Sequence, residues 1–125
     1  MKSQLLEIRR PIESELERYA TLFEKVLSHK ESFMDKPLSH VRAKKGKLMR
    51  PILLLLMAKE WGDVGEVALH SAVTLELLHT ASLVHDDVVD ESNERRGQAS
   101  LHKVYDNKVA VLLGDYMLAL SLHQA

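Results

Sequence analysis

Apolar residues recur every three or four positions through the first part of the chain, from Leu5 to Val26. This spacing places them on one face of a helix whose other face is charged. Pro11 lies inside the pattern, so the helix either begins there or kinks at that point. The periodicity then fades, and we expect a break at Pro37 and a new helix capped by Ser39.

The rest of the chain reads as long apolar helices joined by short polar segments. An apolar run over residues 52–58 ends at two glycines, and a second helix extends from there to about residue 90. A polar loop over residues 92–100 separates it from a further apolar helix that contains Gly114 and Asp115. No alternating strand pattern occurs, so the sequence predicts an all-α fold, a helical bundle forming a single domain over residues 1–125.

The amino-acid composition argues against several classes of protein. The chain has 125 residues, 46% hydrophobic content, a net charge of -1 and no cysteine. We therefore expect a globular protein with no electrostatic footprint for nucleic acid and no disulfide, which fits a reducing compartment. We identify no apolar run of the roughly 18 residues that a membrane span needs, so we expect a cytoplasmic protein without a transmembrane segment.

An acidic cluster lies at the end of the long apolar helix. On a helix Asp86 and Asp90 face the same way, whereas Asp87 points about 100° away. Repulsion among these carboxylates and the helix dipole both oppose their ionisation, so a bound cation would stabilise them. Oxygen ligands suit Mg²⁺, which takes one or two carboxylates and completes its shell with water and substrate phosphates. The alternative is a solvated helix end, but the apolar residues before the cluster place it at the mouth of a buried helix.

A basic segment, residues 44–51, leads into the first apolar helix. Lys47 and Arg50 there, with the backbone N–H groups of a helix start, form a plausible seat for a diphosphate. The segment lacks the glycine and Ser/Thr positions of a phosphate-binding loop, and taken alone it is also compatible with an ordinary basic surface loop.

The order and spacing of four motifs resemble the trans-polyprenyl diphosphate synthases. The motifs are GKLMRP at residues 46–51, HDDVVD at residues 85–90, RRG at residues 95–97 and GDY at residues 114–116. Most relatives show another glycine before Gly46 and a basic residue between Lys47 and Arg50, where this chain has Lys45 and Leu48.

The resemblance implies a head-to-tail prenyl transfer between an allylic prenyl diphosphate and isopentenyl diphosphate. In such an enzyme Asp86 and Asp90 would bind Mg²⁺, Asp87 would assist, and Arg95 would hold the allylic diphosphate. The residues that correspond to the isopentenyl diphosphate seat are Lys47, Arg50, His79 and Arg96.

Two histidines on the long helix have open roles. His79 lies two turns before Asp86 on nearly the same face, where a donor could reach a bound diphosphate; the alternative is a structurally satisfied core histidine. His85 directly precedes Asp86, and the sequence leaves its role undecided.

Product length is expected to depend on the turn before Asp86. Ala81 and Ser82 are small, whereas short-chain relatives carry a large aromatic residue at this level. The resemblance therefore implies a medium-to-long polyprenyl product, unless other helices form the floor of the tunnel.

Relatives are about twice as long or more and carry a second aspartate-rich helix, so the chain resembles their N-terminal half and is expected to be inactive alone. We also expect the apolar helix over residues 109–122 to be unpaired and to favour a homodimer. The alternatives are a non-catalytic regulatory or interaction subunit of a heteromeric prenyl synthase, or a simple metal-binding bundle. Neither alternative explains why acidic and basic clusters occur together.

Overall fold

A computed structural model describes residues 2–43, 48–89, 94–95, 98–99 and 105–124. Helices dominate it, with one pair of two-residue strands. The elements in chain order are α1 Lys2–Arg9, the 3-10 helix η1 Arg10–Ile12, α2 Glu13–Val26, α3 Ser32–Ala43, α4 Met49–Glu60, α5 Glu66–Val89, β1 Glu94–Arg95, β2 Gln98–Ala99 and α7 Asn107–Gln124. The predicted all-α class is confirmed.

The first predicted helix is broken in two at Pro11. The 3-10 turn η1 separates α1 from α2, because proline lacks the N–H group that a continuous helix would need. Beyond this turn the predicted apolar face is buried, with Ile12, Leu16 and Tyr19 all in the core. Ile8 lies on the other side of the break and is exposed. The kink therefore removes α1 from the core face that α2 forms.

The expected break at Pro37 is wrong. Pro37 lies inside α3, where it is buried together with Leu38 and Val41. The apolar contacts of these three residues outweigh the single helical hydrogen bond that proline cannot donate. Ser39 caps no helix either, since its hydroxyl donates to the carbonyl of Lys36 within α3 at 2.6 Å.

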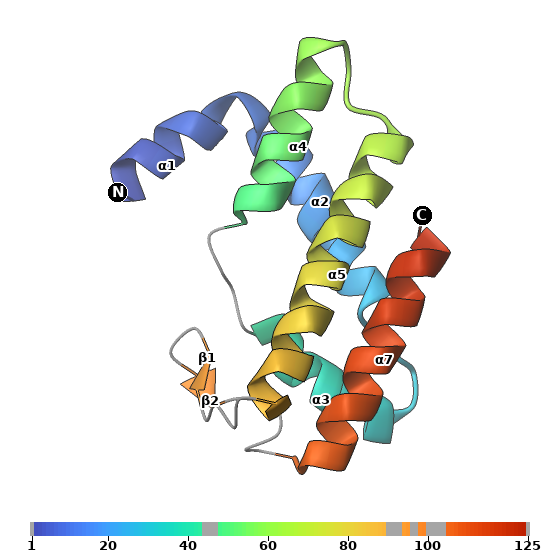
Figure 1. Ribbon diagram of the computed structural model, residues 1–125. Helices are drawn as coiled ribbons and strands as arrows, with labels where there is room; N and C mark the ends of the chain where they lie inside the picture. Colours follow the sequence, from blue (N-terminus) through green and yellow to red (C-terminus); the bar gives the residue numbers. More distant parts are fainter. Residues whose placement is uncertain (1, 44–47, 90–93, 96–97, 100–104, 125) are drawn as a thin grey trace.

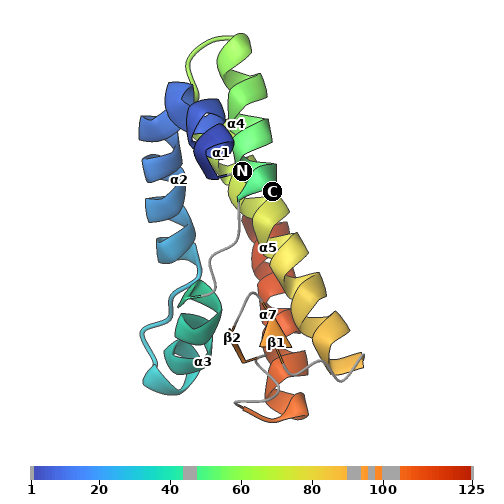
Figure 2. The same cartoon turned by 90° about the vertical axis from the view of Figure 1, so that its left-hand side faces the viewer.

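A helical hairpin of α4 and α5 forms the centre of the molecule. Figure 1 shows α5 running antiparallel to α4 on one side and to α7 on the other. The turn between α4 and α5 passes through Gly62, whose φ of 141° is accessible to glycine at little cost. Turned by 90°, the molecule shows α2 and α3 along one side and α4 and α5 along the other (Figure 2).

The last helix packs along α5 for most of its length, so the expectation that it is unpaired is wrong. It begins at a cap that the sequence analysis missed: Oδ1 of Asp106 accepts a hydrogen bond from the backbone N–H of Val109 at 2.9 Å. Its buried residues, Ala110, Leu113 and Met117, face the core. Part of α7 nevertheless stays exposed, including Leu112 at 61% and Leu122 at 73%.

By length and composition α5 could cross a membrane, which the sequence analysis did not expect. It is the one helix in the described ranges that meets this criterion, and core helices of bundles meet it too. Here α5 contacts α2, α4 and α7, and supplies a large share of the core.

Candidate functional site

One face of α5 stays uncovered along its second half, and this face carries Asp86. Leu75 and Leu78 are 41% and 40% exposed, Ser82 is exposed, and Asp86 follows one turn later. The spacings of three or four residues place these side chains in one row. The two leucines offer apolar contact surface, and Asp86 offers a carboxylate at the end of the row. This arrangement suits a ligand that has a hydrocarbon tail and a charged head group bound through a cation.

The three predicted aspartates separate in the structure. Asp86 is exposed on the open face, whereas Asp87 is buried at 3% exposure on the core side of α5. Asp90 lies outside the described residues. Asp86 is therefore the carboxylate of the cluster that the structure presents to solvent.

The predicted basic residues lie on the segments that flank α5. Arg50 is exposed in the first turn of α4, the helix that precedes α5 and packs against it (Figure 1). His79 is half-buried, roughly 10 Å before Asp86 along the helix axis. Arg95 belongs to β1, which pairs with β2 in a hairpin after the end of α5. Lys47 and Arg96 lie outside the described residues.

The two predicted chain-length residues face different surroundings. Ser82 shares the open face with Asp86, and its hydroxyl donates to the backbone carbonyl of His79 at 2.7 Å. Ala81 is 1% exposed and packs in the core. A ligand that extends from Asp86 along the open face would therefore contact Ser82 rather than Ala81.

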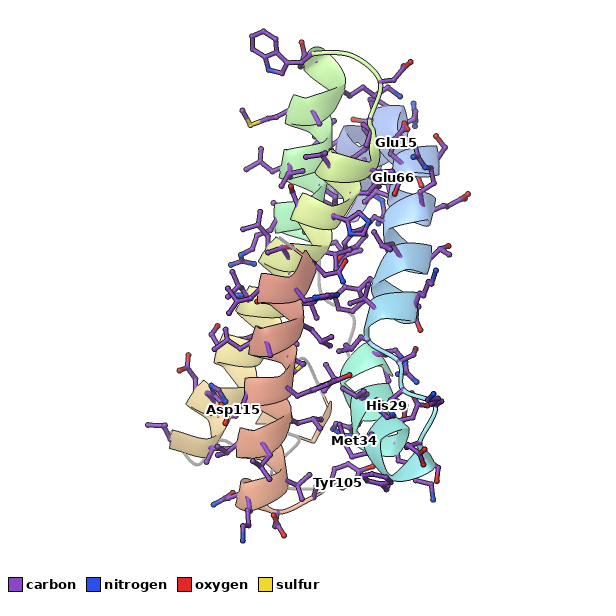
Figure 3. The ribbon with its side chains drawn as sticks, turned by 90° about the vertical axis from the view of Figure 1, so that its right-hand side faces the viewer. Glu15, His29, Met34, Glu66, Tyr105 and Asp115 are labelled. Carbon is purple, nitrogen blue, oxygen red and sulfur yellow. The ribbon has the colours of Figure 1, made fainter. Side chains whose placement is uncertain are left out.

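A contact between α5 and α7 was missed by sequence reasoning. Nε2 of His85 lies 3.2 Å from the carbonyl oxygen of Val111 and 3.2 Å from Oδ1 of Asp115. Figure 3 shows Asp115 on the side of α7 that faces the last turns of α5. The sequence marked Gly114 and Asp115 as part of a motif, but it carried no signal that they contact the residue before Asp86.

The donor chemistry of the site fits a hard divalent cation. Exposed carboxylate oxygens such as those of Asp86 are ligands that Mg²⁺ accepts together with water and phosphate oxygens. Within the described ranges no group of three or more histidine or acidic residues is placed to hold a metal by itself. A cation there would thus share its coordination shell with a ligand or with residues outside these ranges.

Residues 31–125 match the family model for polyprenyl synthetase. The chain belongs to the polyprenyl synthetase family. The matched region contains α3, α4, α5 and α7, and therefore the whole of the open face that ends at Asp86.

The polyprenyl synthetase relatives are longer than this chain. A prenyl transferase of Porphyra purpurea is 38% identical over 114 residues, which cover 89% of this chain and 35% of the relative. Component 2 of the heptaprenyl diphosphate synthase of Bacillus subtilis is 45% identical over 85 residues. These residues cover 66% of this chain and 24% of the relative. A polyprenyl synthase of Caulobacter crescentus was crystallised with calcium and isoprenyl diphosphate. It superimposes on this chain with a TM-score of 0.88 at 28% identity, and the superposition covers 96% of this chain and 37% of that protein. The aligned regions thus cover 35%, 24% and 37% of the length of these three relatives.

Proposed function

We propose that the protein to which this chain belongs condenses an allylic prenyl diphosphate with isopentenyl diphosphate and releases a longer polyprenyl diphosphate. The observation that carries this proposal is the open face of α5, where Leu75, Leu78 and the small Ser82 lie in one row with the exposed carboxylate of Asp86. Such a face would bind a prenyl tail along its length and a diphosphate at its end. Family membership and the isoprenyl diphosphate in the Caulobacter crescentus relative support it.

Asp86 and Asp90 would hold the metal ion, for which we propose Mg²⁺. When bound, the ion neutralises the charge that develops on the leaving diphosphate. Arg95 would bind the same diphosphate, since a guanidinium matches phosphate oxygens with two parallel hydrogen bonds. Asp87, buried beside this site, would assist from the core side of α5.

The second substrate would be seated by donors from other segments. Arg50 is exposed at the start of α4, and the half-buried His79 lies on α5. Together with Lys47 and Arg96 these residues would bind isopentenyl diphosphate. Its double bond attacks the allylic carbon as the diphosphate leaves, and loss of a proton completes the new prenyl unit.

We propose a medium-to-long product, a homodimer and a cytoplasmic location. The small side chain of Ser82 on the open face leaves room for a growing chain, and the Bacillus subtilis relative is named for a heptaprenyl product. Exposed leucines on α7 support association of two copies, since apolar patches of this kind mark interaction surfaces. A chain without cysteine fits the reducing compartment that this location provides.

A second candidate function is a subunit of a heteromeric synthase. The word "component" in the name of the Bacillus subtilis relative favours it, because it describes one part of an assembly. A purely regulatory subunit would have no chemical need for the exposed Asp86 and Arg50.

The test is prenyl transfer by the complete gene product. Purified protein is incubated with geranyl or farnesyl diphosphate, radiolabelled isopentenyl diphosphate and Mg²⁺, and products are separated by chain length. We expect products of seven or more units that vanish when a chelator is added. A protein that forms no product alone, but forms it after a second subunit is added, would support the heteromeric function instead.

A further inference from the structure

Besides the apolar packing between α5 and α7, one imidazole in the last turns of α5 contacts polar groups of α7. Nε2 of His85 lies 3.2 Å from both the carbonyl oxygen of Val111 and Oδ1 of Asp115. A carbonyl and a carboxylate both accept hydrogen bonds, so an imidazole N–H between them has two acceptors within reach. The contact therefore defines the orientation of the ring.

Gly114 makes this contact possible. A Cβ atom at Gly114 would lie 2.3 Å from Nε2 of His85 and 2.5 Å from its Cδ2. No side chain fits there while the imidazole occupies its place. The imidazole is the end of a rotatable side chain, so a methyl group at this position would displace the ring rather than the helix backbone.

The contact lies where α5 needs support. His85 and Asp86 are consecutive, and both belong to the last part of a helix that ends at Val89. Helix ends fray because their final carbonyl groups lack helical partners. A bond from His85 to α7 restrains the backbone that carries Asp86, while Asp86 itself points to the open face.

We propose that His85 is a positioning residue for the metal site: seated in the space left by Gly114 and bonded to Val111 and Asp115, it holds the end of α5 so that the carboxylate of Asp86 is directed at the metal. This proposal rests on the proposed function, since it needs Asp86 to be a metal ligand. In this proposal His85 contacts neither metal nor substrate. Gly114 and Asp115 of α7 support metal binding indirectly, because they seat the His85 ring.

The experiment measures Mn²⁺ binding to the complete gene product in the presence of inorganic diphosphate. Electron paramagnetic resonance counts free Mn²⁺, so affinity is obtained without turnover, and thermal unfolding without metal is recorded in parallel. We expect His85→Ala to weaken Mn²⁺ binding by about tenfold, the lower end of the loss seen when groups that orient metal ligands are removed. Gly114→Ala should weaken it equally, because it displaces the same ring.

Three further variants separate positioning from packing. The double variant of His85→Ala with Gly114→Ala should bind Mn²⁺ no more weakly than His85→Ala alone, because the ring that the methyl group displaces is already absent. His85→Gln should retain most of the affinity, since its amide nitrogen reaches about as far as Nε2. His85→Asn, whose donor lies one carbon closer to the backbone, should behave like His85→Ala.

The outcome separates this proposal from the proposed function. If Asp86→Asn abolishes Mn²⁺ binding while the His85 and Gly114 variants lose thermal stability but keep wild-type affinity, the contact only packs two helices and the positioning role is wrong. If the wild-type protein binds no Mn²⁺ with diphosphate, or Asp86→Asn binds it normally, both the site and the positioning role are overturned.

Discussion

Adjacent residues on α5 have different surroundings, and this difference decides which of them can contact a ligand on the open face. Asp86 is exposed and Asp87 is buried, while Ser82 is exposed and Ala81 is buried. Helical geometry predicted that neighbours point about 100° apart. It could not predict which neighbour faces solvent, because α5 is apolar on nearly every side and its sequence marks no outer face.

Substitution of Ser82 tests the path of the product. We expect Ser82→Phe in the complete protein to shorten the products, because its ring would stand on the open face one turn before Asp86. Ala81→Phe should instead lower stability by about 1–3 kcal/mol through overpacking, with less effect on length. Product chromatography and thermal unfolding of both variants are the measurements. Unchanged products from Ser82→Phe would show that the chain does not grow along this face.

A second prediction at the residue scale concerns the stability contributed by a buried carboxylate on α2. Glu15 is 6% exposed, and Nζ of Lys59 on α4 donates to it at 2.7 Å (Figure 3 labels Glu15). The same ammonium group donates to the carbonyl of Pro11 at 3.0 Å. We expect Lys59→Met to lower the free energy of unfolding by about 1–2 kcal/mol, measured by urea denaturation at pH 7, since a buried carboxylate loses its charged donor.

The same pair predicts a pH dependence. The hydrogen bond from Lys59 holds the pKa of Glu15 below its ordinary value of 4.5. A lowered pKa in the folded state contributes stability above pH 4.5 that is lost as the pH falls through the folded value. The difference between wild type and Lys59→Met should therefore shrink in acid. Lys25→Met, an exposed lysine of α2, is the control, and an equal loss there would mean that the pair contributes nothing specific.

At the scale of elements, the sequence predicted the helices that have strong local signals. Glycines near residues 62–65 and the long apolar run marked both ends of α5 within a residue or two. Prediction failed at α3, because tertiary burial of Pro37 outweighed the local rule that proline ends a helix. The pairing of α5 with α7 was missed for a related reason: contacts between distant segments leave no periodic signal.

The guanidinium of Arg42 cross-links the junction of α2 and α3. Arg42 donates to both carboxylate oxygens of Asp35, at 3.0 and 3.2 Å, and also to the carbonyl of Leu27. This bidentate bond lowers the pKa of Asp35. We expect Arg42→Met to speed amide hydrogen exchange across residues 27–35, because the junction loses its cross-links. Lys36→Met, an exposed cation on α3, should leave exchange there unchanged, and equal protection in both variants would contradict this role.

At the scale of the whole molecule, apolar side chains remain exposed on several helices, α4 and α7 among them, and they predict association. Leu112 on α7 and Leu53 on α4 are each 61% exposed. If the α7 face joins two copies of the complete protein, Leu112→Asp should weaken dimerisation at least about tenfold, since a charge would enter an apolar interface. Sedimentation measures it, and Leu53→Asp is the matched control. Dimers that resist Leu112→Asp but not Leu53→Asp would place the interface on α4.

The central claim is that the open face of α5 ends at a metal ligand for prenyl transfer. The most direct measurement compares the complete protein with its Asp86→Asn and Asp63→Asn variants in a Mg²⁺-dependent assay with labelled isopentenyl diphosphate. Asp63 is an exposed aspartate in the turn between α4 and α5, at the far end of the hairpin from Asp86. We predict that Asp86→Asn lowers kcat/KM at least about 100-fold, a loss of about 2.7 kcal/mol, with an unchanged melting temperature. Asp63→Asn should behave as wild type. Full activity of Asp86→Asn at every Mg²⁺ concentration would contradict the account.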